Sequence, residues 1–131
     1  MYKAAGALLT FNNLVLLGRR SNICHNFAGY WSMPCGMIEL DEDPKLAAIR
    51  ELYEETLITI KSENTKFLTS YNMSGTHKFA VFHSELYDLI FPDENAKDFF
   101  EHDEWGYYNI QENSLPTPIT ENTINSILML K

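Results

Sequence analysis

The stretch Gly36–Ile58, GMIELDEDPKLAAIRELYEETLI, decides how the rest of the chain is organised. Its second half predicts a helix with Asp43 as the N-cap and Pro44 at the first helical position, where proline is tolerated. Apolar residues then recur at helical spacing. At about 100° per residue, three of them fall together on one side of the helix: Leu46, Ile49 and Tyr53.

Three carboxylates, Glu51, Glu54 and Glu55, share another side of this helix at positions i, i+3 and i+4. Like charges at that spacing repel, and the helix C-terminus near them favours basic residues instead. Arg50 offsets only part of this repulsion, and the short side chain of Ala47 leaves room between the carboxylates. The cluster is explained if a hard divalent cation neutralises it, because oxygen ligands suit Mg²⁺ or Mn²⁺. The alternative is an ordinary solvated acidic face.

The residues around this cluster resemble the Nudix box, G-x5-E-x7-R-E-U-x-E-E-x-G-U, in which U is a bulky aliphatic residue. Gly36, Glu42 and the run Arg50–Ile58 match the pattern and its spacing at every specified position except one. The preceding run Trp31–Gly36, WSMPCG, looks like the W-x-x-P-G-G lead-in of the same family. A match of this length and spacing is far more specific than a lone short motif.

Two residues depart from the family pattern. Leu57 replaces the second glycine of the box, and Cys35 replaces the first glycine of the Pro-Gly-Gly lead-in. Glycine after a helix usually serves a left-handed turn, where leucine would cost roughly 1–2 kcal/mol, so we expect the local turn to differ here. We interpret Cys35 as a small buried residue without a catalytic role. Neither change removes a carboxylate.

The resemblance implies the fold and the core of the site. The fold would be α/β, a Nudix-like α/β/α sandwich around a mixed β-sheet that occupies residues 1–131 as one domain. By resemblance, Glu51, Glu54 and Glu55 are the metal ligands, and one of them also orients or deprotonates water. The residues expected to support the site structurally are Gly36, Glu42 and Arg50, the last two through a salt bridge.

Other residues are candidates for substrate contacts. Arg20, or Arg19, stands where a basic residue in the family meets substrate phosphates, and guanidinium offers a fork of donors. Phe27, Tyr30 and Trp31 either offer a face for a base or pack in the core, and core packing is favoured for Trp31. In the late segment, Glu101 is the candidate for an additional ligand or catalytic acid, and Glu104 is the second candidate.

Composition excludes several classes of protein. The chain has 131 residues, which suits one domain, and its net charge of −8 argues against broad binding to a nucleic-acid backbone. No apolar run approaches the roughly 18 residues of a membrane span, and the N-terminus indicates a strand instead of a signal peptide. The only two cysteines, Cys24 and Cys35, lack disulfide or zinc spacing. We therefore expect a cytoplasmic protein with reduced thiols that binds neither duplex nucleic acid nor membrane; a homodimer is left open.

The remaining elements follow from apolar runs and turn signals. Residues 3–10 and 13–18 predict a hairpin and 21–30 a loop. Further strands are expected within 59–71, within 76–89 and over 101–109, with a hairpin connection at 72–75. Residues 94–100 are interpreted as a short helix. Thr120 is expected to cap a final helix over 121–130.

The reaction that the resemblance implies is metal-dependent hydrolysis of a pyrophosphate bond in a nucleoside diphosphate linked to another moiety. The enzyme would use Mg²⁺, with Mn²⁺ as a substitute, and a small-molecule nucleotide substrate. Nucleotide sugars, ADP-ribose, nucleoside triphosphates and dinucleoside polyphosphates all remain open. An alternative is a catalytically weak nucleotide-binding or sensor module on the same fold, marked by Leu57 and Cys35. A plain acidic protein with no ligand is the third hypothesis.

Overall fold

The structure is a computed structural model that describes the backbone of residues 1–131 and the side chains of residues 1–111 and 113–131. Over that range the strands form a seven-stranded sheet. In chain order the elements are β1 (Tyr2–Phe11), β2 (Leu14–Arg20), β3 (Trp31–Ser32), β4 (Cys35–Met37), α1 (Pro44–Thr56), η1 (Ser62–Asn64), β5 (Thr65–Asn72), β6 (Lys78–Glu85), η2 (Phe99–Glu101), β7 (His102–Asn109), η3 (Glu112–Ser114) and α2 (Glu121–Leu128).

The sheet is mixed because β1 and β6 run parallel at its centre, whereas the other named strand pairs are antiparallel. The predicted hairpin of β1 and β2 is confirmed, with Phe11 opposite Leu14. Asn12, in its turn, has a φ of 55°, a left-handed conformation that asparagine tolerates. The predicted strands within 59–71 and 76–89 are confirmed as β5 and β6, and the predicted strand over 101–109 as β7.

Beyond that turn β1 and β2 diverge, and the lead-in to the box fills the space between them. β4 pairs with the first half of β1, placing Gly36 opposite Ala5, while β3 pairs with the last part of β2, placing Trp31 opposite Arg19. The segment between Trp31 and Met37 is thereby fixed in the middle of the sheet. This arrangement brings the start of the box beside α1.

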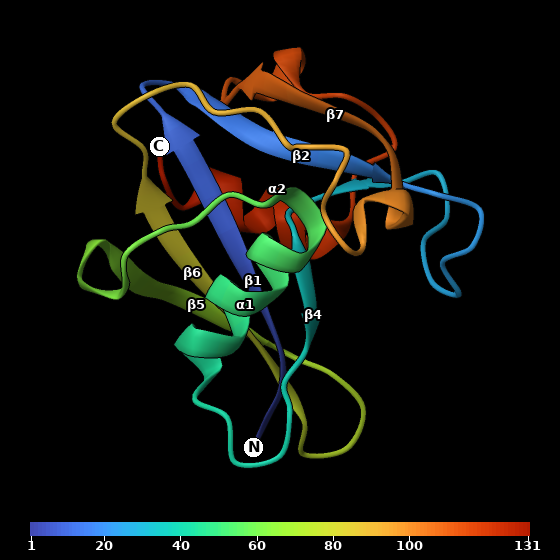
Figure 1. The fold of residues 1–131 in the computed structure, drawn as a ribbon, viewed down its shortest axis with the longest axis vertical. Coiled ribbons are helices and arrows are strands. Elements are labelled where there is room, and N and C mark those ends of the chain that lie inside the picture. Colours follow the sequence, from blue (N-terminus) through green and yellow to red (C-terminus); the bar gives the residue numbers. More distant parts are fainter.

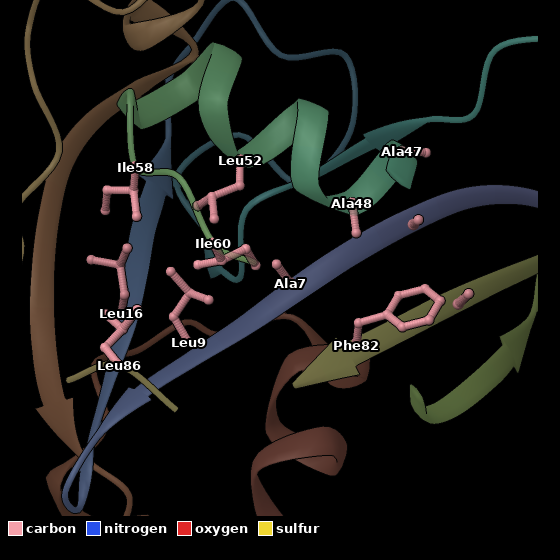
Figure 2. Packing of buried hydrophobic residues seen from close by; sticks show 12 residues of the cluster. Ala7, Leu9, Leu16, Ala47, Ala48, Leu52, Ile58, Ile60, Phe82 and Leu86 are labelled. Carbon is pink, nitrogen blue, oxygen red and sulfur yellow. The ribbon is translucent and has the colours of Figure 1, made fainter. Parts of the chain in front are cut away.

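Helices cover both faces of the sheet. Figure 1 shows α1, in green, in front of β1 and α2, in red, behind it. Side chains of β1 alternate between the two layers, since Ala7 and Leu9 belong to the cluster under α1 and Leu8 belongs to the cluster with Ile127 of α2. Figure 2 shows the first cluster, in which Leu52 and Ala48 of α1 lie over β1 and Phe82. The predicted α/β/α sandwich is confirmed.

The buried side of α1 differs from the apolar side that periodicity indicated. Leu46 and Tyr53 are 51% and 49% exposed. The side toward the sheet instead carries small and polar residues with one large apolar side chain, namely Ala47, Ala48, Leu52, Glu55 and Thr56. Small side chains are favoured on this side of α1 because the helix lies close over the alanines of β1, which leaves little depth between helix and sheet. Ala47 is fully buried in this layer, so it does not leave open space between the carboxylates as expected.

The short helix expected over 94–100 is wrong. Turns occupy most of this segment, and only η2, a single 3₁₀ turn, is helical. Its backbone is tied to the end of α1, where the N–H of Asp93 donates to the carbonyl of Thr56 and the N–H of Asp98 donates to the carbonyl of Glu54. The last carbonyls of a helix lack partners within the helix. The N–H groups of this segment bond to those carbonyls of α1, so they are not used to form a helix of its own.

The final helix is shorter than predicted and is capped differently. α2 ends at Leu128, and Thr120 occupies its N-cap position. The Thr120 hydroxyl donates to the Thr123 hydroxyl (2.7 Å) and makes no capping bond to the backbone. Among the described residues, no helix combines the length and the apolar character needed to cross a membrane.

Candidate active site

Strand β4, which leads toward α1, passes close to the Glu51 carboxylate at Gly36, so a larger residue there would displace that carboxylate. A Cβ placed on Gly36 would lie 2.1 Å from the Glu51 carboxylate carbon. The start of α1 is fixed by Asp43, whose carboxylate accepts from the backbone N–H groups of Lys45 and Leu46, as predicted for an N-cap. The box therefore places the Glu51 carboxylate directly against β4.

Arg50 organises the carboxylates at the surface of α1. Its Nε and Nη2 donate to both oxygens of Glu42 at 2.8 and 2.9 Å, so the predicted Glu42–Arg50 salt bridge is present. Its Nη1 donates to Glu51 (3.0 Å) and to Glu54 (3.1 Å). The bond from Arg50 lowers the pKa of the Glu42 carboxyl below its usual value. One guanidinium thus balances several acids and ties the loop to the helix.

Leu57 adopts the left-handed conformation that its glycine counterpart in the family pattern would serve. Its φ is 63° and its ψ is 9°, and its N–H donates to the carbonyl of Tyr53 at 2.8 Å. The expectation of a different local turn is therefore wrong. The turn is retained because the surrounding bonds hold it, including those of the buried Thr56 hydroxyl, which donates to the Leu52 carbonyl and accepts from the Ile58 N–H.

Glu55 and His102 form a buried pair of polar groups behind the cleft. Both side chains are almost fully buried, at 0% and 2% exposure, and the Glu55 Oε1 lies 3.9 Å from the His102 Nδ1. Within the described part of the chain, neither carboxylate oxygen and neither ring nitrogen has a hydrogen-bond partner. Burial raises the pKa of Glu55 well above its usual value, with further contributions from Glu101 and Glu51. Burial also lowers the pKa of His102 to about 4.

A cleft of about 720 Å³ opens beside these groups. One part of its wall is charged and includes Arg20, Glu51, Asp98 and Glu101. Another part is largely apolar or small and includes Ala4, Met33, Cys35 and Phe79, and the polar residues 120–123 at the start of α2 complete the lining. A charged region continuous with an apolar region suits a ligand that has an anionic part and a flat apolar part.

Two carboxyl groups in this cleft, those of Glu51 and Glu101, have pKa values above their usual value. Burial raises the pKa of Glu51, an effect that the nearby Arg50 opposes. Burial and then the charge of Asp98 raise the pKa of Glu101. Acids with raised pKa values in a cleft are characteristic of functional sites, because such sites gather like charges.

The structure separates the two candidate arginines. Arg20 lines the cleft, with its Nε held by the carbonyl of Asn26 at 2.8 Å. Arg19 lies outside the cleft lining and pairs with Asp103 (2.7 Å) and Glu104 (3.5 Å) across β7. Arg20 is therefore the better placed of the two to meet a phosphate.

Glu101 and Glu104 are separated in the same way, because only Glu101 lines the cleft and Glu104 pairs with Arg19. Tyr30 is also outside the lining. Its ring packs edge-on against Phe27, 5.5 Å between centroids, and it is Phe27 that lines the cleft.

Three contributions to the site went unrecognised in the sequence. Asp98 lines the cleft from the segment that is tied to α1, and His102, at the start of β7, faces Glu55. Cys35 lines the cleft while only partly buried, where a buried residue was expected. The charge of Glu55 contributes to raising the pKa of Cys35 to about 12, after the larger effect of burial. The residues HDEW in the late segment were the available signal for His102, but nothing local showed that it would face Glu55.

The donor set fits a hard divalent cation, although the described side chains contain no group of three or more His, Cys, Asp or Glu residues already arranged to hold one. The fit rests on the unpartnered buried oxygens of Glu55 beside the oxygen donors of Glu51 and Glu101. A buried carboxylate without a partner is costly unless a cation or a donor completes it. The Arg50 Nη1 already contacts one carboxylate oxygen of Glu51 and one of Glu54.

Comparison with known proteins identifies the family. The chain matches the family model described as the NUDIX domain over residues 2–127. Nudix hydrolase 25 of Arabidopsis thaliana is 46% identical over 65 residues, a match that covers 47% of this chain and only 35% of that protein.

Solved structures share the fold at lower identity. A MutT NUDIX hydrolase from Burkholderia pseudomallei is 20% identical, with a TM-score of 0.82 over 100% of this chain and 99% of that one. A bifunctional NMN adenylyltransferase/ADP ribose pyrophosphatase from Francisella tularensis, solved with AMP and a Mn ion, is 23% identical, with a TM-score of 0.67 over 97% of this chain and 39% of that one. With a family match that spans nearly its whole length and a sheet that places the box as described, this chain belongs to the NUDIX family.

Proposed function

We propose that this chain hydrolyses the pyrophosphate bond of a nucleoside diphosphate linked to another moiety, in a reaction that depends on a divalent cation. The observation that carries the proposal is the cleft, where Glu51, Asp98, Glu101 and Arg20 line one part and apolar side chains line another. A diphosphate ester needs charge neutralisation for its phosphates and an apolar surface for its base. The cleft offers both next to the Nudix box.

Glu51, Glu54 and Glu55 would hold the cation. Their oxygen donors favour Mg²⁺, and Mn²⁺ is an acceptable substitute. When bound, the cation lowers the pKa of a coordinated water and neutralises charge that develops on the phosphates. Gly36 allows the Glu51 carboxylate to lie against β4, and Arg50 bonds both Glu51 and Glu54.

The remaining charged residues of the cleft have separate roles in this proposal. Arg20 binds a substrate phosphate through its Nη groups while the Asn26 carbonyl holds its Nε. Glu101, whose pKa is raised by burial and by Asp98, accepts a proton at its carboxylate from the attacking water. The apolar wall orients the rest of the substrate and excludes water.

The alternative of a weak nucleotide-binding or sensor module loses one of its two supports. It was marked by Leu57 and Cys35, and Leu57 keeps the left-handed turn of a glycine. The Cys35 side chain lines the cleft where a glycine would leave more room. It would therefore affect which substrate fits, and it does not remove any of the carboxylates.

The test is a hydrolysis assay on nucleotide sugars, ADP-ribose, nucleoside triphosphates and dinucleoside polyphosphates, with Mg²⁺ and then Mn²⁺ at mildly alkaline pH. We expect cation-dependent cleavage of at least one class, reduced by at least 10²-fold in Glu54→Gln and Glu55→Gln, because each variant removes a proposed ligand. Glu39→Gln is the matched control, since Glu39 is 70% exposed at 3.8 Å from Arg50 and is expected to retain activity.

Nucleotide binding without turnover by the wild-type protein would favour the sensor module over the enzyme. Cleavage that persists without a divalent cation, or in both Gln variants, would contradict the proposed role of the box.

A further inference from the structure

We propose that His102 is a positioning residue for the metal site: its imidazole N–H donates to the Glu55 carboxylate and orients the other oxygen of that group toward the cation. The inference rests on the proposed function, because it assigns a partner to one of the proposed ligands. It concerns a side chain that lies outside the Nudix box.

The first support is the state of the two side chains. The Glu55 Oε1 and the His102 Nδ1 face each other at 3.9 Å, and both groups are buried. In the described part of the chain, neither group has a hydrogen-bond partner. Buried polar groups are normally hydrogen-bonded. Two unpaired groups that face each other therefore point to a hydrogen bond that forms when one side chain rotates.

The second support is the way in which the fold aims His102. It is the first residue of β7 and lies opposite Arg20 in the ladder with β2. The ladder has a register shift between Arg19 and Arg20, so the side of the ring is given by Gly18, two residues from Arg20 on β2. A Cβ on Gly18 would lie 2.7 Å from the His102 ring, which places the ring on the same side of the sheet as the cleft arginine. The ring packs against Trp105, with centroids 4.4 Å apart.

A third support is the space that the sheet reserves for this ring. A Cβ on Gly18 would lie 2.7 Å from the His102 ring and 2.8 Å from Trp105, so a glycine at that position admits both. Packing against Trp105 and over Gly18 leaves the ring little freedom, which is the condition for it to orient another group.

A neutral imidazole carries one N–H, and a carboxylate that binds a cation through one oxygen can accept that hydrogen on the other. Partners of this kind orient a metal ligand without touching the metal, and their removal typically weakens metal affinity about 10–100-fold. Arg50 already serves Glu51 and Glu54 in this way at the surface of α1. Within the described residues, His102 is the group placed to do the same for Glu55.

The experiment measures Mn²⁺ binding without substrate, by electron paramagnetic resonance of free Mn²⁺, in wild type, His102→Phe and His102→Asn. Phenylalanine keeps the packing on Trp105 and removes the donor, whereas asparagine keeps an N–H near the Nδ1 position. We expect the Mn²⁺ dissociation constant to rise about tenfold or more in His102→Phe and to stay within about threefold of wild type in His102→Asn.

A thermal melt in the presence of a chelator reports whether each variant is folded, and His102→Leu replaces His102→Phe if the latter fails to fold. Equal Mn²⁺ affinity in wild type and His102→Phe would overturn the inference, and so would equal weakening in His102→Phe and His102→Asn. In a Glu55→Gln background, His102→Phe is expected to add less than twofold; a full tenfold effect there would show that His102 does not act through Glu55.

The two proposals fail in different ways. Absence of Mn²⁺ binding by the wild-type protein would overturn the metal site itself and the inference with it. Normal binding by wild type and by His102→Phe would overturn only the role of His102.

Discussion

Leu57 shows how one residue can keep a turn that does not suit it. The left-handed conformation is unfavourable for a side chain with a Cβ, by roughly 1–2 kcal/mol. The bond from its N–H to Tyr53 and the two bonds of the buried Thr56 hydroxyl hold the chain in place nevertheless. The strain is therefore local and is opposed by the packing around the C-terminus of α1.

Replacement of Leu57 by glycine should relieve this strain. We expect Leu57→Gly to be more stable than Leu57→Ala by about 1 kcal/mol, because alanine keeps the Cβ while removing the rest of the side chain. Urea unfolding of both variants measures the difference. If Leu57→Ala is as stable as Leu57→Gly, the φ of 63° is not a source of strain.

At the scale of elements, α1 both carries the acids and covers the sheet. Its attachment depends on few large side chains, since Ala47 and Ala48 bring it close to β1 and Leu52 fills the space over Leu9 and Ile58. The acids on the same helix are placed correctly only while this contact holds.

Leu52→Ala should loosen α1. Leu52 is fully buried, so we expect a loss of about 3 kcal/mol in the free energy of unfolding from lost burial and the cavity left behind. Leu46→Ala is the matched control on the exposed side of the same helix and should change stability by less than about 0.5 kcal/mol. Chemical denaturation of both variants gives the values. A similar loss in both would mean that the buried side of α1 has been misidentified.

At the scale of the whole molecule, a chain with a net charge of −8 places the Glu55 carboxylate in its interior. Glu55 has a pKa raised well above its usual value of 4.5, chiefly by burial. Its ionised form is therefore disfavoured in the folded state relative to the unfolded chain. The metal-free protein loses stability as the pH rises from about 4.5 through the raised pKa, and the loss is then complete.

Glu55→Gln removes that ionisation. With a chelator present, we expect the variant to be more stable than wild type by roughly 1–3 kcal/mol at pH 8, and the gain to vanish near pH 4.5, where Glu55 is protonated in both states. Thermal melts across this range test the expectation. Glu54→Gln, which changes a partly exposed acid bonded to Arg50, should show no such gain. A gain for Glu55→Gln that does not depend on pH would argue against burial as its cause.

Sequence by itself determined the local features of this protein. The N-cap at Asp43, the hairpin at Asn12, the Glu42–Arg50 pair and the late strand β7 each depend on residues close in the chain or on a motif with fixed spacing. The α/β/α architecture followed from the same motif through its family.

Only the tertiary structure decided which side of α1 is buried, because that depends on the size of the residues it meets on β1. It also decided that Glu55 and His102 face each other, that Asp98 enters the cleft and that Arg20 and not Arg19 lines it. These relations join residues distant in the sequence or opposite sides of one strand. Periodicity and spacing contain no information about which partner lies across a contact, so packing alone could settle them.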